Sequence, residues 1–67
     1  MQFKRGDVVK VIGNMDREFS DRHGAFVEYA PIGNDAQGYA RLALYGDAKD
    51  RRVLVHPESL TLVHRAA

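Results

Sequence analysis

Charged and aromatic side chains in two segments of the chain are the residues best suited to bind a ligand. Residues 15–23 hold two arginines, a phenylalanine and a histidine, and residues 45–52 hold a tyrosine, a lysine and two arginines. Arginine binds phosphate or carboxylate groups through paired hydrogen bonds, and an aromatic ring can stack on a base or a proline. The predicted binding residues are Arg17, Phe19, Arg22, His23, Tyr45, Lys49, Arg51 and Arg52.

Acidic residues in the same two segments allow a simpler interpretation. The first segment contains Asp16, Glu18 and Asp21, and the second contains Asp47 and Asp50. Mixed charges of this kind are common on solvated protein surfaces and stabilise the fold little. A binding cleft and an ordinary charged surface therefore both stay open.

The sequence predicts no catalytic residue, no metal site and no cofactor. Ser20, Asp21 and His23 are the residue types of a hydrolytic triad, but neighbours in an irregular loop seldom have the ordered hydrogen bonds that a triad needs. The other two histidines, His56 and His64, lie far from His23 in the sequence, and no cysteine joins them. A glycine-rich phosphate-binding motif is also absent from the sequence.

Length and composition predict one small domain over residues 1–67. A chain of this length buries only about 60% of its unfolded surface, so its core is expected to be small. Ten Lys and Arg residues against nine Asp and Glu residues give a net charge of +1, whereas nucleic-acid-binding domains are often clearly basic. The charge balance therefore favours a protein partner over nucleic acid.

The sequence also predicts a cytoplasmic location. It contains no cysteine, its apolar runs are short, and its first residues are charged with no apolar stretch behind them. These features fit a reducing compartment and give no sign of a secretory signal or a membrane-spanning segment. No interaction with a membrane is expected.

Five short segments have the composition and alternation of β-strands. Glycine, proline, asparagine and aspartate separate them at intervals of about ten residues, which is typical of a small all-β barrel or sandwich. A long loop is expected over residues 15–23, a second loop or a wide hairpin over 31–38, and a single tight helical turn over 57–60. The predicted strands cover residues 7–12, 24–30, 39–45, 52–56 and 61–63.

Alternation along these strands also predicts the core. Val9 and Val11 share one face of the first strand, while Lys10 marks the other face as solvated. The aliphatic face of the third strand is expected to be buried for the same reason. The predicted core residues are Val9, Val11, Phe26, Ala40, Leu42, Leu44, Val53, Val55, Leu60 and Leu62.

The two ends of the chain resemble KOW-type domains and related Src-homology-3-like (SH3-like) barrels. The first end runs from Phe3 to Ile12 and combines the Gly6-Asp7 turn with alternating valines, followed after a loop by Gly24. The second end, Val53 to Val63, is similar to the closing strand, helical turn and final strand of the family. This resemblance implies a five-stranded SH3-like barrel with one short 3-10 turn before the last strand. KOW domains bind RNA, polymerase or ribosomal protein, while other barrels of this shape bind peptides or partner subunits.

A second resemblance is to plasmid-type (type II) dihydrofolate reductases. These are small barrels that close with Val-Gln-Ile-Tyr-Pro and assemble in fours around a central pore, which is the active site. The matching stretch here is Val53 to Pro57, in which Leu54 stands at the position of the glutamine and His56 at that of the tyrosine. Since leucine cannot make the polar contacts of such a pore, reductase activity is not expected.

The sequence thus predicts a non-catalytic binding module, or a small accessory subunit, that recognises a protein partner. A KOW-like accessory of transcription or translation that binds nucleic acid is the alternative. An oligomeric pore enzyme of the type II dihydrofolate reductase kind ranks third, because one small barrel offers little concave volume for a substrate. The sequence leaves the oligomeric state open.

Overall fold

The computed structural model describes residues 2–13, 16–46 and 51–67 of a chain that consists mostly of strands. The five strands are β1 (Val8–Val11), β2 (His23–Ile32), β3 (Asp35–Leu44), β4 (Arg52–Val55) and β5 (Leu60–His64). Two 3-10 helices, η1 (Arg17–Phe19) and η2 (Pro57–Ser59), lie between them. No helix in the described ranges is long and apolar enough to cross a membrane.

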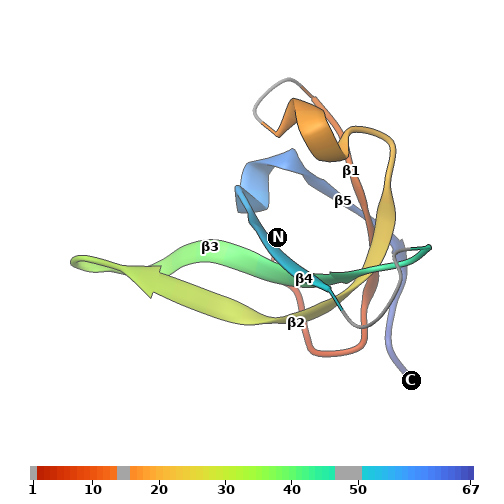
Figure 1. Cartoon of the computed structure of the whole chain (residues 1–67). Coiled ribbons are helices and arrows are strands. Elements are labelled where there is room, and N and C mark those ends of the chain that lie inside the picture. Colours follow the sequence, from red (N-terminus) through yellow and green to blue (C-terminus); the bar gives the residue numbers. More distant parts are fainter. Residues whose placement is uncertain (1, 14–15, 47–50) are drawn as a thin grey trace.

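All five strands belong to one antiparallel sheet with the order β4-β3-β2-β1-β5 (Figure 1). The all-β class, the five strands and the helical turn before the last strand are confirmed. Within the described ranges, however, β4 and β5 are not paired, so the sheet is not closed by hydrogen bonds. The structure thus establishes an antiparallel sheet, and closure into a barrel is not shown.

The hairpin alternative for residues 31–38 is confirmed, because these residues belong to the ends of β2 and β3 and to the short turn between them. Only Gly33 and Asn34 separate β2 from β3. The cluster of turn-forming residues suggested a loop, but Gly38 lies within β3 with φ at 53°, beside an irregularity in the pairing near Ala30. A strand can hold such a glycine at a bulge. The hairpin projects from the rest of the molecule (Figure 1).

The connection between β1 and β2 is also more regular than the predicted loop over residues 15–23. Its helix η1 is closed by a hydrogen bond of 3.0 Å from the Phe19 N–H to the Asp16 carbonyl. The chain then returns to β1, where the Val11 N–H donates to the Arg22 carbonyl and the Asp21 N–H donates to the Val11 carbonyl, both at 2.9 Å. The connection is therefore held at both of its ends.

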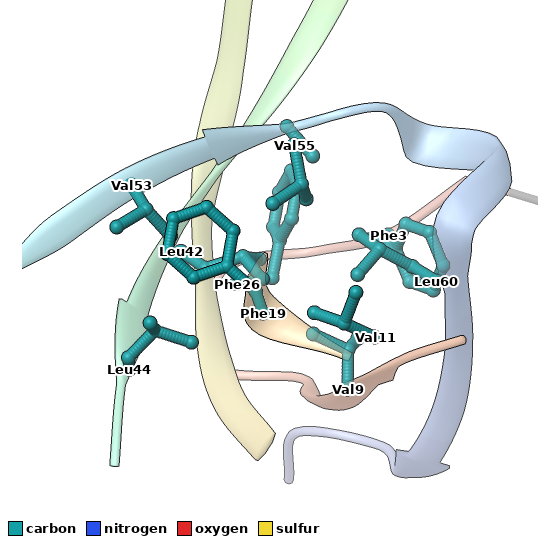
Figure 2. Packing of buried hydrophobic residues seen from close by; sticks show 11 residues of the cluster. Phe3, Val9, Val11, Phe19, Phe26, Leu42, Leu44, Val53, Val55 and Leu60 are labelled. Carbon is teal, nitrogen blue, oxygen red and sulfur yellow. The ribbon is translucent and has the colours of Figure 1, made fainter. Parts of the chain in front are cut away.

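Buried apolar side chains from all five strands and from η1 form one core cluster. Nine of the ten predicted core residues belong to it, and the tenth, Leu62, packs against it while partly buried. Figure 2 shows these side chains converging from β1, β3 and β4 around Phe26. The sequence analysis missed Phe3 and Phe19, since both lie outside the alternating segments.

Asp7 is a fully buried carboxylate that ties both ends of the chain to the start of β1. Its Oδ1 accepts a hydrogen bond of 2.8 Å from the Ala66 N–H, and its Oδ2 accepts one of 2.9 Å from the Lys4 N–H. The Arg65 Nη1 lies 3.7 Å from Oδ2. These two hydrogen bonds hold the pKa of Asp7 below its usual value of 3.8, with help from the Arg65 and Lys4 charges and against the opposing effect of burial.

Acid is expected to destabilise the fold through Asp7. Because the pKa of Asp7 is lower in the folded than in the unfolded chain, its stabilising contribution is complete above about pH 4 and is lost as the pH falls through the folded-state pKa. Asp7→Asn should therefore lower the urea midpoint of unfolding at neutral pH, and this difference from the wild type should shrink below about pH 4. Urea titrations followed by circular dichroism at a series of pH values measure both midpoints.

Comparing the wild type with Asp7→Asn at each pH separates the contribution of Asp7 to stability from that of the other carboxylates. Asp16 also has a lowered pKa, so the stability of both chains falls in acid. Only the difference between their midpoints reports Asp7. A difference that stays constant from neutral pH down to strong acid would contradict the assignment.

Candidate ligand-binding surface

Arg22, His23 and Tyr45 meet where β2 begins and β3 ends. The Tyr45 N–H donates a hydrogen bond of 3.0 Å to the His23 carbonyl, which extends the pairing of these strands by one step. The Arg22 Nη2 donates a second bond, also 3.0 Å, to the Tyr45 carbonyl. The Tyr45 ring is 50% exposed and His23 is exposed. An aromatic ring and two basic side chains from the two segments thus share one place on the surface.

Arg51 and Arg52 join the same end of the sheet from β4. The Leu44 N–H donates to the Arg51 carbonyl at 3.3 Å, and Arg52 pairs with Ala43 of β3. Both arginines are exposed. We name this surface the basic end of the sheet, and it consists of Arg22, His23, Tyr45, Arg51 and Arg52.

The other three predicted binding residues are Arg17, Phe19 and Lys49, and of the two that the structure describes, neither is tied to the basic end by a contact given above. Phe19 is only 9% exposed and belongs to the core cluster, so its ring is not available to stack on a ligand. The turn of η1 explains this, because it directs Phe19 inward while Arg17 stays on the surface. Lys49 lies outside the described residues.

One of the acidic residues expected to balance these cations contacts a lysine. The Asp21 Oδ1 lies 3.8 Å from the Lys10 Nζ, and both side chains are exposed. An exposed pair at this distance stabilises the fold little. Ser20, Asp21 and His23 form no hydrogen bonds with one another in the described part of the chain, so they do not make a triad.

A second polar cluster, which the sequence did not predict, joins the connection between β1 and β2 to the start of η2. The Asp16 Oδ2 accepts a hydrogen bond of 2.9 Å from the His56 N–H, and the His56 Nδ1 lies 3.2 Å from the same oxygen. The edge of the Tyr39 ring meets the imidazole at 5.0 Å between ring centres, with the planes at 84°. The side chain of Asp16 is only 12% exposed.

The electrostatics of this cluster fit a structural tie. Burial raises the pKa of Asp16, but the nearby Ser59 hydroxyl and the hydrogen bonds from His56 outweigh burial and leave the pKa below its usual value. The buried Ser59 hydroxyl makes no hydrogen bond of regular geometry with the described residues, yet it lies near enough to the Asp16 carboxylate to lower its pKa. A triad needs the serine beside the imidazole and not beside the carboxylate. Asp16 therefore links η1 to η2, and its separation from His56 by 40 positions left no local sequence signal.

Metal binding finds no support in the described ranges, where no three His, Asp or Glu side chains gather closely enough to hold an ion. The charged groups that the structure brings together at the basic end are cationic, and cations bind anionic ligands such as carboxylates and phosphates. The basic end is therefore the candidate functional site.

Comparison with known proteins adds no further constraint. No family model, curated protein or solved structure matches this chain. The function is accordingly inferred from the residues of the basic end and from the strands around it.

Proposed function

We propose that the chain is a non-catalytic binding module, or a small accessory subunit, that recognises an acidic segment of a protein partner. The observation that carries this proposal is the gathering of Arg22, His23, Tyr45, Arg51 and Arg52 at one end of the sheet. Guanidinium groups bind carboxylates through charge-assisted hydrogen bonds, and an exposed tyrosine offers contact area at low cost in conformational entropy. Both features are common in protein-binding surfaces.

The distribution of charge over the rest of the chain favours a protein over nucleic acid. The net charge is only +1, and the projecting hairpin contains two acidic residues and no lysine or arginine between residues 28 and 40. A phosphate backbone carries a dense negative charge, so it needs a broad basic surface and is repelled by acidic projections. A short acidic peptide needs only the local cluster.

Nucleic acid is the second candidate, favoured by one observation. Tyr45 has an exposed side chain, and Arg22 binds its backbone carbonyl; an exposed aromatic residue with a cation nearby is suited to the stacking of an unpaired base. A KOW-like accessory of transcription or translation would use the site in this way. Binding that weakens steeply with added salt would distinguish this candidate.

We also propose that the sheet curls into an SH3-like barrel in which β4 and β5 approach each other through their core-facing side chains without pairing, so that the outer backbone edge of β4 stays open. The strand order β4-β3-β2-β1-β5 supports this, because it leaves β4 and β5 as the two edges, joined only by η2. The Ile12 N–H further donates to the Ser59 carbonyl at 2.5 Å, which holds η2 against the end of β1. Nuclear Overhauser contacts between the facing side chains of β4 and β5 in an isotope-labelled sample would test the closure.

Titration of the labelled protein with two probes tests the proposed function. The first probe is a short synthetic peptide of alternating glutamate and valine, and the second is mixed-sequence single-stranded RNA. We expect the peptide to shift the backbone amide signals of the basic end and Arg52→Ala to weaken its binding about tenfold, as the loss of one charge-assisted hydrogen bond would. Because Arg52 is exposed, this variant should keep its fold.

Arg5→Ala is the matched control, since it removes the same charge from an exposed residue outside the basic end. It should change the affinity by about twofold or less. Equal losses in the two variants would mean that only the overall charge matters. Signal shifts with RNA alone would favour nucleic-acid binding. If neither probe shifts the signals, both proposed functions are contradicted.

A further inference from the structure

Strand β4 is an edge of the sheet whose outer side is open. It pairs with residues 40–43 of β3, and within the described ranges no other strand pairs with it. Its side chains alternate strictly, with Val53 and Val55 in the core and Arg52 and Leu54 exposed on the other face. An open edge of this kind can accept a further strand.

The hydrogen-bond pattern identifies the backbone groups that face outward. The Leu44 N–H bonds to the Arg51 carbonyl, and bonded and non-bonded pairs alternate along an antiparallel ladder. The pairs of Val53 and Val55 with β3 are therefore the bonded ones, and the N–H and C=O groups of Arg52 and Leu54 point away from β3.

His56 provides an independent check of this assignment. It follows Leu54 by two positions, so its N–H should also point outward, and it donates to Asp16 outside the sheet. Asp16 thus covers the edge at His56, whereas no backbone group of the described residues pairs with the outer side of Arg52 or Leu54. No hydrogen bond of the Leu54 backbone beyond the ladder is present in the described part of the chain.

The opposite edge of the sheet is less suited to accept a strand. The pairing of β5 with β1 shifts register between Val8 and Val9, and such irregularities blunt an edge. The pairing of β4 with β3 keeps a constant register over all four pairs. The two edges therefore differ, and β4 is the regular one.

We infer that the acidic segment of the partner docks as an added strand on the outer edge of β4. This inference rests on the proposed function and names the site within it. Main-chain hydrogen bonds to Arg52 and Leu54 would supply affinity, and side chains at alternate positions would supply specificity. A carboxylate would lie beside Arg52, and an apolar side chain would cover Leu54, which is 44% exposed.

Charge complementarity argues for an acidic peptide and against a second copy of the chain. The paired segments 40–43 and 52–55 contain two arginines and no acidic residue, and since Arg41 is ion-paired with Glu28 of β2, Arg52 is the arginine that an incoming acidic strand would meet. Two copies of β4 paired antiparallel through the outward groups of Arg52 and Leu54 would place each Arg52 opposite Leu54 of the other copy, so the arginine charges would gain no partner. An acidic strand instead gains from the same charges.

Proline at position 54 tests the docking mode. The Leu54 N–H faces the open edge, so Leu54→Pro removes a donor to the incoming strand and no bond to β3. We expect Leu54→Pro to weaken binding of the Glu-Val peptide about tenfold or more, and Leu54→Ala, which keeps the N–H, to weaken it only about threefold. Amide spectra and urea titrations of both variants report whether the fold is kept.

A chemically synthesised chain with N-methylleucine at position 54 serves if the proline variant does not fold, since it removes the same N–H and keeps the side chain. Contacts between the peptide Hα atoms and those of Arg52 or Leu54 would support the added strand. Equal affinity of the peptide for the wild type and both N–H-lacking chains would overturn this inference and leave the proposed function standing. No binding to the wild type would overturn both. Equal affinity for a Lys-Val peptide would overturn the acidic character of the ligand.

Discussion

Replacing Leu42 with alanine is expected to remove a large share of the stability of the fold. Leu42 is completely buried in the second half of β3, where it pairs with Phe26 of β2 and Val53 of β4. Removing a buried leucine side chain costs about 2–5 kcal/mol, because apolar surface is lost and a cavity is left. A domain of 67 residues has a total stability of only about 3–10 kcal/mol, so this one loss is a large share of it.

Leu54→Ala provides the matched control for this prediction, because it makes the same chemical change on the exposed face of the neighbouring strand. Its side chain already meets solvent, so the variant should unfold within about 0.5 kcal/mol of the wild type. Urea unfolding followed by circular dichroism, with amide spectra of the same samples, measures both. Similar losses in the two variants would contradict the assignment of the strand faces.

The success of the core prediction has a simple physical origin. In a strand, side chains alternate between two faces, and only one face of each strand in this small sheet can reach the core. The alternation of Val53 and Val55 with Arg52 and Leu54 therefore predicts burial directly, and it does so in β1 and β3 as well. The same rule says nothing about residues outside strands, which is why Phe3 and Phe19 were missed.

The length of the hairpin strands and the polar clusters could not be predicted from the alternation of side chains. Turn-forming residues usually mark loops, but a glycine can also stand inside a strand where the pairing is irregular, and this depends on the partner strand. The contacts of Asp16 with His56 and of Asp7 with Ala66 join residues 40 and 59 positions apart. Neither pair follows a local pattern, so both appear only once the sheet has formed.

The candidate site was predicted in part. Arg22, His23, Tyr45, Arg51 and Arg52 meet because β2 begins, β3 ends and β4 begins at the same end of the sheet. Strand order alone, once known, brings these positions together. The open edge of β4 is a property of the hydrogen-bond ladder, and no residue type marks it in the sequence.

The hairpin offers the second large effect, at Gly38. Its φ of 53° lies in the left-handed region, and a Cβ built there would meet the Ala30 carbonyl oxygen at 2.0 Å. Alanine at this position would therefore be strained by its own backbone and would collide with a neighbouring strand. We expect Gly38→Ala to cost about 3 kcal/mol or more, with the largest changes in the amide signals of β2 and β3 beyond Tyr29.

Gly33→Ala separates the cost of backbone strain from the cost of the collision. Gly33 has nearly the same φ, 55°, but a Cβ there would meet no atom within 4 Å. Its loss of stability should thus come from the backbone alone and amount to about 1 kcal/mol. Urea midpoints of the two variants give the cost of the collision as a difference. If that difference is near zero, the chain near Ala30 can shift to admit a methyl group, and the close approach of β2 to Gly38 is not what makes glycine necessary there.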